Sequence, residues 1–395
     1  MIAVVLDGQL QSALATVRSL GEKGIKVFCG SHNRLGMSLF STYCSRRFYY
    51  TSPRESEKKF IDDIMDVVKS SSEEIVIYCF SDETFLPISK CRNLFPTSVK
   101  LILPAPENVE IAFDKDRTLH LAQQVGVPIP ETYFISNLEE VKKIAASISY
   151  PAVIKPRHSC FWQDDRGYFG SVSLVDSPEK LLFEYEKIYQ QVKELPLVQE
   201  YIDGGEYGAF FLFEKGEVIA EFAHQRIRSI SPYGGASTLR KSIAMSEDMK
   251  DCSMRLLKDL NWHGPVMVEF KRNCETGLLN LMEINGRWWG SLPLAIYAGV
   301  DFPYLYYQLA NNKITKAENY KLDIISRHLL ADTKNLLTVL SKKNEIKILP
   351  YPDKKKTLKE FCKFFGKKLY YDVESLADSL PFYMELLSTI SKLKK

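Results

Sequence analysis

The sequence predicts an α/β protein in three parts: an N-terminal domain built on a parallel sheet, a larger region of mostly antiparallel strands, and a helical C-terminal tail. Short apolar runs alternate with helical patterns at the start of the chain, which is typical of a parallel sheet whose strands are joined by helices. Antiparallel strand patterns dominate residues 207–285, and lysines gather in the tail. We expect the three parts to cover residues 1–112, 113–315 and 316–395.

The N-terminal part is predicted from its apolar periodicity. Its first turn, Asp7-Gly8-Gln9-Leu10-Gln11, lacks G-x-G-x-x-G, and the chain contains no G-x-x-x-x-G-K-[ST], which excludes a dinucleotide fingerprint and a P-loop. Pro104-Ala105-Pro106 interrupts regular structure and marks the end of this part. The predicted strands are 2–6, 25–29, 75–80 and 100–103, and the predicted helices are 11–23 and 57–69.

The composition excludes several classes of protein. Of the 395 residues, 45% are hydrophobic and 26% are charged, so the chain can bury cores and is not disordered. A net charge of +3 provides no footprint for nucleic acid over the whole chain. The cysteines form no CxxC pair, which favours reduced thiols over disulfides or zinc. Neither a signal peptide nor a membrane-spanning apolar run is found, so we expect a cytoplasmic protein.

The middle part combines two helices with several strands. Gly126-Val127-Pro128 ends the first helix, Pro156 ends the first strand, and Asp203-Gly204-Gly205 ends the second. The predicted helices are 114–125 and 247–260, and the predicted strands are 152–155, 197–202, 208–213 and 217–224.

The most informative segment is VMVEFKRNCETGLLNLMEINGR, residues 266–287, which predicts a β-hairpin. We expect strands over 266–272 and 278–285. The loop Glu275-Thr276-Gly277 suits a type I turn followed by glycine in the left-handed position. That loop sets the register of the two strands.

The register places Glu269 directly opposite Glu283, and two like charges so placed are destabilising unless a cation lies between them. Asn285 lies on the same face, because side chains alternate along a strand. Two carboxylates and one amide suit Mg²⁺ bound together with phosphate. Arg287 continues the alternation and is positioned to reach a phosphoryl oxygen. The alternative is an ordinary exposed sheet face. The opposite face carries the core residues Val268, Phe270, Met282 and Ile284.

Two lysines could complete a nucleotide site. Lys155 closes a predicted strand, so its ammonium group would emerge where phosphates commonly bind, and Lys115 opens a predicted helix. Each lysine alone is more often a surface charge. Together with the carboxylate hairpin, they indicate a phosphate site.

The ordered series of segments resembles the ATP-grasp superfamily, in particular its carboxylate–amine ligases related to the carbamoyl-phosphate synthetase large subunit and to D-aspartate ligase. The resemblance implies a preceding α/β domain and a two-subdomain ATP-grasp clasp, with a lid subdomain at about 150–197. The matching segments are FDKDRTLHLAQQVGVPIPET (113–132), YPAVIKP (150–156), LVQEYIDGGEYG (197–208) and VMVEF…LMEINGRWWGS (266–291).

The resemblance also implies roles for individual residues. Lys115 and Lys155 would contact the phosphates of ATP, Glu206 would contact the ribose, and Arg287 would act on the transferred phosphoryl group. Adenine would be recognised by backbone groups of Glu200 and Ile202 in a hinge that includes Tyr201. Mg²⁺, with Mn²⁺ as an alternative, would be bound by Glu269, Glu283 and Asn285.

Two departures from the family pattern affect the predicted site. The family's lid loop is usually rich in glycine, whereas residues 157–171 are aromatic and contain only Gly167 and Gly170. Met267 stands where some amino-acid ligases carry an arginine, so Arg287 would have to supply that charge. This second departure favours the branch similar to carbamoyl-phosphate synthetase.

Candidate substrate-binding residues lie on a strand and in two loops. Arg226 and Arg228, which are expected to share a strand face, match a carboxylate, and Ser237 in Gly234-Gly235-Ala236-Ser237-Thr238 supplies donors. The alternative is a surface loop. Asp82 follows a strand end, where open α/β sheets bind ligands, and could face an amine.

The lysine-rich tail admits two interpretations. Its lysines are interleaved with Phe361, Phe364, Phe365 and Tyr370, as in surfaces that bind nucleic acids or anionic membranes. We favour a solvated helix whose aromatic side packs on the preceding domain.

The resemblance leads to an ATP-dependent ligase that activates a carboxylate as an acyl-phosphate and couples it to an amine. The substrates would be an amino acid or a peptide-like small molecule. Such chemistry relies on charge neutralisation and alignment and needs no protein nucleophile. Two alternatives remain open: an ATP-grasp carboxylase or phosphotransferase, and a non-catalytic ATP-binding scaffold. A homodimer is one option for the assembly, with no nucleic-acid partner.

Overall fold

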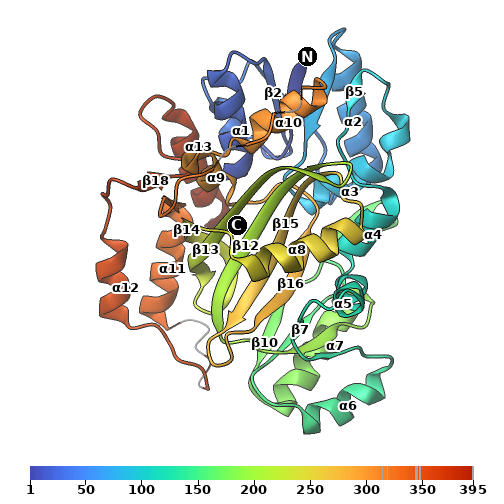
Figure 1. Cartoon of the computed structure of the whole chain (residues 1–395), viewed down its shortest axis with the longest axis vertical. Coiled ribbons are helices and arrows are strands. Elements are labelled where there is room, and N and C mark those ends of the chain that lie inside the picture. The colour runs from blue at the N-terminus through green and yellow to red at the C-terminus, as the bar shows by residue number, and fades with distance from the viewer. Residues whose placement is uncertain (314, 318, 343–345, 347, 394–395) are drawn as a thin grey trace.

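The computed structural model describes every residue except 314, 318, 343–345, 347, 394 and 395. The described residues form three larger sheets and one two-stranded hairpin. In Figure 1 the N-terminal sheet lies above, the large central sheet in the middle and the lid sheet below. The predicted α/β architecture is therefore confirmed, with a parallel N-terminal sheet and a C-terminal end that is mainly helical.

The N-terminal sheet is entirely parallel and has the strand order β3-β2-β1-β4-β5. The prediction missed β3, which begins with two arginines, and α3, which contains Pro87 in its interior, and β5 covers residues 99–100 instead of the predicted 100–103. The strands are β1 Ile2–Val5, β2 Val27–Ser31, β3 Arg46–Tyr49, β4 Ile75–Tyr78 and β5 Val99–Lys100. The helices are α1 Gln11–Glu22, α2 Glu57–Lys69 and α3 Asp82–Lys90, with short 3₁₀ turns η1 Met37–Phe40 and η2 Arg92–Leu94.

Two helices from much later in the chain complete one face of this sheet. They are α9 Leu292–Ala298 and α10 Phe302–Ala310, which pack beside α1. Tyr306 donates a hydrogen bond to the carbonyl of Ile77 at 3.2 Å, and Tyr78 donates to the carbonyl of Pro303 at 2.9 Å. These buried contacts hold the end of the carboxylate hairpin against the N-terminal part.

The proline pair at 104–106 begins a helix. Pro106 occupies the first turn of α4 Pro106–Phe113, where a missing N–H costs nothing. A second helix, α5 Lys115–Gln124, follows at once, and the Asp114 carboxylate accepts hydrogen bonds from the amides of Asp116 and Arg117.

The lid is an antiparallel sheet covered by two helices. Its strand order is β10-β7-β11-β6, and its apolar side packs on α6 and α7. The strands are β6 Thr132–Tyr133, β7 Ala152–Lys155, β10 Ser173–Val175 and β11 Leu197–Glu200, and the helices are α6 Leu138–Ser147 and α7 Pro178–Val192. A separate hairpin, β8 Cys160–Gln163 and β9 Arg166–Phe169, projects from the lid.

The central sheet has seven strands in the order β16-β15-β12-β13-β14-β17-β18. The helix α8 Glu247–Asp259 covers one face with Leu256 and Leu257. On the other face, Phe210 and Leu212 pack in the core that includes α9 and α10, and polar side chains occupy the remaining part. The strands are β12 Gly204–Glu214, β13 Glu217–Ser231, β14 Gly234–Ile243, β15 Gly264–Asn273, β16 Leu279–Asn285, β17 Ile325–Arg327 and β18 Leu369–Tyr371.

The hairpin β15–β16 pairs Glu269 with Glu283, as the sequence predicts. A β-bulge then shifts the register by one residue, so that Phe270 pairs with Leu281. The connection is therefore four residues long, Cys274–Gly277, and the prediction of a three-residue loop was wrong. Gly277 does adopt the left-handed conformation, with φ of 70°. The bulge also turns the Met282 side chain away from the core, where the sequence placed it. Met282 instead lines the same cavity as Glu283.

The C-terminal tail is tied into the central sheet. β18 pairs with β17, and the buried Asp372 carboxylate accepts hydrogen bonds from Arg240 of β14 and Ser326 of β17. The Arg327 guanidinium lies 4.4 Å from the ring centroid of Phe361. The favoured interpretation therefore holds for Phe361 of α12, whereas Phe365 is 97% exposed and does not pack on the preceding domain. The tail helices are α11 Leu329–Ser341, α12 Lys354–Phe361 and α13 Leu380–Leu393.

The pair formed by His328 and Glu385 makes the stability of the protein dependent on pH. Burial alone would lower the pKa of His328, but hydrogen bonding and attraction to Glu385, aided by Asp372 and opposed by Arg240, raise the pKa above its ordinary value. The stabilisation by this pair is therefore full below about pH 6.5, the ordinary pKa of a histidine. It is lost as the pH rises through the higher pKa that His328 has in the folded state.

We expect the difference in unfolding free energy between wild type and His328→Gln to shrink as the pH rises above neutrality. Urea unfolding at a series of pH values measures it. A difference that stays constant from pH 6 to pH 9 would contradict the assignment.

Among the described residues, no helix is both long and apolar enough to cross a membrane.

Candidate active site

Two strands of the central sheet carry the acidic centre of the site. Asn285 donates a hydrogen bond from its amide nitrogen to Glu283 at 2.9 Å, and Glu269 accepts one from Arg226 at 3.1 Å. Both glutamates are only partly exposed, and they face each other across β15 and β16. Arg226 thus offsets part of the repulsion between the two glutamates, and a cation bound between them would offset the rest.

The two carboxyl groups have opposite pKa shifts. Burial and repulsion from Glu283 and Glu206 raise the pKa of Glu269 against the attraction of Arg226. Burial also acts on Glu283, but Lys115, Asn285 and Lys155 outweigh it and lower the pKa of that carboxyl. Glu283 is therefore the group that stays charged and is ready to bind a cation.

The donor set fits a hard divalent cation with help from a phosphate. Among the described residues, no cluster of three His, Cys, Asp or Glu side chains could hold a metal ion by itself. The two carboxylates would supply oxygen ligands, and the Asn285 oxygen, which accepts from Arg287 at 3.0 Å, keeps a second lone pair. Mg²⁺ suits such an incomplete set, because it is usually held by one or two carboxylates plus substrate phosphates.

Arg287 joins the acidic centre to the N-terminal part. Its Nε donates to Asp82 at 2.6 Å, and Asp82 opens helix α3 at the end of β4. The structure thus brings Asp82 to the site, where its carboxylate is paired with Arg287. Arg287 and Asn285 together form a continuous polar link from Glu283 to the N-terminal sheet.

The two predicted lysines converge on the acidic centre from different elements. Lys155 ends β7 of the lid, while Lys115 begins α5 and donates to the hydroxyl of Ser159 at 2.9 Å. Burial lowers the pKa of Lys155 to about 8, with further lowering by Lys115 and Lys271, and opposition from Glu283 and Glu269. Two cations close together without a full set of counter-ions form a strong attraction for anions.

A cavity of about 410 Å³, here called the clasp cavity, separates the lid sheet from the central sheet. One wall is apolar, from Val153, Leu174 and Ile202, and the opposite wall carries the acidic centre and Met282. An apolar wall that faces cations and carboxylates suits the base and the phosphates of a nucleotide.

The hinge at the back of the clasp cavity has several of its backbone groups engaged. The Glu200 amide donates to the carbonyl of Glu131 at 3.0 Å, and the Ile202 carbonyl accepts from Lys271 at 3.3 Å. The Lys271 ammonium lies over the ring of Tyr201, 4.9 Å from the ring centroid. A base bound in the clasp cavity would therefore form its backbone hydrogen bonds with the Glu200 carbonyl and the Ile202 amide.

A smaller inner cavity of about 160 Å³ adjoins the acidic centre on the side of the N-terminal part. It is lined by Arg287, Ser237, Met267 and Gln11, among others. The Ser237 hydroxyl is buried without a hydrogen-bond partner, so a donor or acceptor of a ligand could satisfy it.

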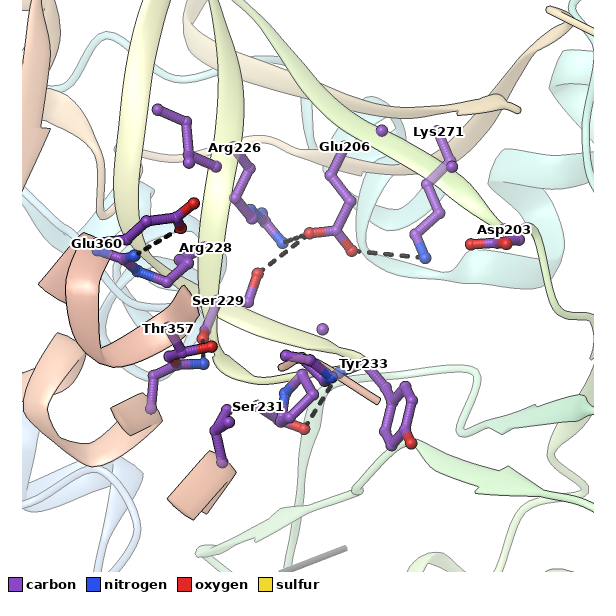
Figure 2. A pocket seen from close by; sticks show the side chains of 18 of the residues that line it. Asp203, Glu206, Arg226, Arg228, Ser229, Ser231, Tyr233, Lys271, Thr357 and Glu360 are labelled. Carbon is purple, nitrogen blue, oxygen red and sulfur yellow. Dashed lines mark hydrogen bonds and ion pairs between the residues drawn. The ribbon is translucent and has the colours of Figure 1, made fainter. Parts of the chain in front are cut away.

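A third, outer cavity of about 480 Å³ lies between β13 and the tail helices α11 and α12. Figure 2 shows its polar lining, with Glu206 between Arg226 and Lys271 on one side and Thr357 and Glu360 of α12 on the other. Glu206 accepts a hydrogen bond from Arg226 at 3.0 Å. The clasp and outer cavities meet at Glu206, Arg226 and Lys271.

The two predicted substrate arginines are held by different acids. Arg226 lies among all three cavities and bridges Glu206 and Glu269. Arg228 donates to the buried Asp332 at 2.8 and 3.0 Å, because irregularities in the pairing of β13 with β14 turn this part of the strand toward α11. Arg226 is therefore placed to contact ligands, whereas Arg228 mainly anchors the tail.

The projecting β8–β9 hairpin reaches from the lid to the N-terminal part. Trp162 donates from its indole nitrogen to the carbonyl of Pro53 at 2.8 Å, and the Arg54 guanidinium lies 3.6 Å from the Phe169 ring centroid. Asp165, at the tip, accepts hydrogen bonds from Ser56 at 2.5 Å and from the Lys58 amide at 2.9 Å at the start of α2. The aromatic lid segment thus docks on the first domain.

Some site residues were missed by sequence reasoning. Lys271 stands two positions after Glu269, so the alternation of the strand could have placed it in the cleft. Gln11 and Trp289 lack such a signal, because the packing of α9 and α10 on the N-terminal sheet brings them to the inner cavity.

Comparison with solved structures identifies the fold. The fold matches the biotin carboxylase domain of Hydrogenobacter thermophilus 2-oxoglutarate carboxylase, with a TM-score of 0.63 and 18% identity over 82% of this chain and 73% of that one. It also matches N5-carboxyaminoimidazole ribonucleotide synthetase from Thermus thermophilus, with a TM-score of 0.58 and 15% identity over 81% of both chains. Both comparisons define an ATP-grasp fold.

Sequence comparison points the same way. Residues 193–329 match the family model described as "ATP-grasp in the biosynthetic pathway with Ter operon". The chain is therefore similar to ATP-grasp proteins in sequence over this stretch and in fold over most of its length.

Curated relatives include carbamoyl phosphate synthase large chains. The protein from Thermotoga neapolitana is 27% identical over 34% of this chain, and that from Clostridium acetobutylicum is 20% identical over 68%. The aligned segments span only 11% and 25% of the lengths of these two relatives.

Proposed function

We propose that the protein is an ATP-dependent ligase that activates a carboxylate as an acyl-phosphate and couples it to an amine. The observation that carries this proposal is the convergence of two lysines, two carboxylates and Arg287 on one point between the clasp and inner cavities. Alignment and charge neutralisation of this kind are the main contributions of a protein to phosphoryl transfer.

In this proposal ATP occupies the clasp cavity. The apolar wall formed by Val153, Leu174 and Ile202 holds the adenine, and the hinge at Glu200–Ile202 reads its edge. Glu206 accepts from the ribose, and Lys155 and Lys115 hold the phosphates. Mg²⁺, bound by Glu269, Glu283 and Asn285 with the phosphates, would withdraw charge from the transferred group.

The inner cavity is assigned to the carboxylate substrate. Its volume of about 160 Å³ fits a small acid, and Arg287 and Ser237 supply hydrogen-bond donors. One carboxylate oxygen attacks the γ-phosphorus, and ADP leaves. Arg287 steadies the anionic acyl-phosphate that results.

The outer cavity is assigned to the amine substrate, such as an amino acid. It carries both signs of charge, with Lys356 and Lys271 set against Asp203 and Glu360, which suits a zwitterion. The amine attacks the carbonyl carbon and loses a proton, the C–O bond breaks, and phosphate leaves with one substrate oxygen. The docked lid excludes water from the intermediate.

Isotope transfer tests the proposal. The protein is supplied with ATP, Mg²⁺ and a panel of amines, together with small carboxylates labelled with ¹⁸O. The release of ADP and phosphate is measured, and the phosphate is analysed by mass spectrometry. We expect turnover to require both a carboxylate and an amine, with one ¹⁸O atom in each phosphate released.

Other outcomes support the remaining functions. Turnover that needs only bicarbonate would indicate a carboxylase, in keeping with the carboxylase structures that share the fold. Transfer of the γ-phosphate to an acceptor that retains it would indicate a phosphotransferase. Tight ATP binding without turnover would indicate a scaffold.

A further inference from the structure

The inner cavity carries polar groups that the protein itself leaves unpaired. Four of the residues that line it have a buried nitrogen or oxygen atom for which the described part of the chain offers no hydrogen-bond partner. Buried polar atoms are normally paired, and leaving one unpaired costs free energy. A polar ligand or ordered water must therefore complete this cavity. The four atoms are His224 Nδ1, Arg226 Nε, Ser237 Oγ and Trp289 Nε1.

Two of these groups, the His224 imidazole and the Trp289 indole, are held in the most buried part of the cavity lining. Each residue is 1% exposed and packs against the ring of Phe210. The ring centroids lie 4.7 Å apart for His224 and Phe210, and 4.6 Å apart for Trp289 and Phe210. Neither group is needed for the proposed carboxylate contacts, which come from Arg287 and Ser237. Both are therefore available for another part of the ligand.

Gly208 keeps the His224 ring and the acidic centre in one cavity. It pairs with His224 of β13 on one side and with Glu269 of β15 on the other, so the three residues share a face of the sheet. A Cβ atom at Gly208 would lie 3.0 Å from His224 Nε2 and 2.6 Å from Phe210 Cζ. A side chain at this position would therefore fill the space between His224 and Glu269.

The protonation of the two groups defines the chemistry that satisfies them. Burial, together with repulsion from Arg226 and Arg240, lowers the pKa of His224 well below its ordinary value, so the imidazole is neutral. A neutral imidazole has one N–H group and one lone pair, whereas an indole has only an N–H group. A hydroxyl group both donates and accepts, so it can pair with either tautomer of His224 and accept from Trp289.

Other substituents fit these groups less well. An ammonium group cannot accept a hydrogen bond from the indole, and a hydrocarbon group would leave both rings unpaired. A second carboxylate would lack a counter-charge, because Arg226 is already paired with Glu206 and Glu269. Burying a charge without a partner is costly. The lining therefore favours a neutral hydroxyl.

We propose that the acid bound in the inner cavity is a small hydroxy acid, whose carboxylate contacts Arg287 and Ser237 and whose hydroxyl contacts His224 and Trp289. The proposal rests on the proposed ligase function and adds the class of its carboxylate substrate. The hydroxyl takes no part in the bond changes of the reaction. Its contacts determine which acid is bound.

Isothermal titration calorimetry of the full chain, with Mg²⁺ and a nonhydrolysable ATP analogue present, tests the proposal. Lactate, propionate and alanine share one carbon frame and carry a hydroxyl, a hydrogen and an ammonium group at the same carbon. The set 3-hydroxybutyrate, butyrate and 3-aminobutyrate places the substituent one carbon further away, and each enantiomer is measured. In at least one set, we expect the hydroxy acid to bind at least about tenfold more tightly than both analogues, because they leave buried groups unpaired.

Two variants connect this preference to the cavity. His224→Phe keeps a flat ring against Phe210 but removes both nitrogens, so we expect the preference for the hydroxy acid to disappear while the affinity for the unsubstituted acid stays the same. Trp289→Phe removes the indole donor and is expected to weaken the preference. It also replaces the first variant if that one does not fold.

Trp262→Phe provides the matched control. Trp262 is also fully buried, and its indole nitrogen finds no partner among the described residues, but it lies in the core beneath α8, outside the three cavities. We expect this variant to keep the preference of the wild type. Thermal unfolding verifies that each variant folds.

Two results would overturn the proposal. One is a hydroxy acid that binds no more tightly than its unsubstituted analogue in either set, including the case in which no acid binds, which would assign the unpaired atoms to water. The other is a preference that persists in both His224→Phe and Trp289→Phe. Failure of the ligase function gives a different result: hydroxy-acid binding that depends on His224, without transfer of ¹⁸O into phosphate, supports the binding site and refutes the acyl-phosphate.

Discussion

Replacement of Glu283 by glutamine is expected to slow ATP-dependent phosphate release by about 100- to 1000-fold, the range measured when one electrostatic contact to a transition state is removed. Glu283 is the carboxylate whose pKa is lowered, and it lies at the meeting point of Lys115, Lys155 and Arg287. Glutamine keeps the shape and the hydrogen bond with Asn285 but removes the charge that would hold Mg²⁺. Phosphate release at saturating ATP and Mg²⁺ measures the effect.

A matched control separates this effect from unfolding. Glu275→Gln makes the same chemical change at the exposed turn of the same hairpin and is expected to leave turnover unchanged. Glu283→Gln removes attraction to Lys115 and Lys155 as well as repulsion from Glu269, so the melting temperatures of both variants are measured to verify that they remain folded. Unchanged turnover in Glu283→Gln would refute the metal assignment.

Replacement of Asp372 by alanine is expected to lower the unfolding free energy by about 3–5 kcal/mol, because it leaves a buried charge without its partner. Arg240 is fully buried at 0% exposure, and Asp372 is 1% exposed. Their pairing joins β14 to the tail, and the Asp372 amide also donates to the carbonyl of Arg327 at 2.9 Å. Chemical denaturation at neutral pH measures the loss.

Asp323→Asn provides the comparison, because asparagine tolerates the left-handed backbone of this residue, which has a φ of 61°. Like Asp372, Asp323 forms an ion pair with a residue of β14, since its carboxylate lies 3.5 Å from the ammonium of Lys241. The Asp323 side chain, however, is 63% exposed. Exposed pairs contribute about 0–1 kcal/mol, so this variant should stay close to the wild type. A loss below about 1 kcal/mol in Asp372→Ala would show that water reaches Arg240 once the carboxylate is gone.

The sequence could predict those features that depend on neighbours along the chain. Alternation within β15 and β16 and a short loop were enough to place Glu269 opposite Glu283. Strong apolar periodicity was enough to give α2 its observed bounds, residues 57–69. Lys155 was placed correctly at the end of β7 for the same reason.

Features that depend on distant partners could not be predicted. The bulge at Met282 follows from pairing over the whole length of the hairpin, and no local residue marks it. The three residues of β18, Leu369–Tyr371, become a strand only because β17 offers an edge. Arg226 and Arg228 stand two positions apart, yet the irregular pairing of β13 sends them to different acids.

The docked lid hairpin gives the protein an intrinsic optical probe. Trp262, Trp288 and Trp289 are at most 2% exposed, whereas Trp162 is partly exposed and touches Pro53 through its indole nitrogen. Separation of the lid from the first domain would break that contact and place this indole in water, while the other three stay in the core. A change in tryptophan emission that is lost in Trp162→Phe would therefore report each opening of the lid.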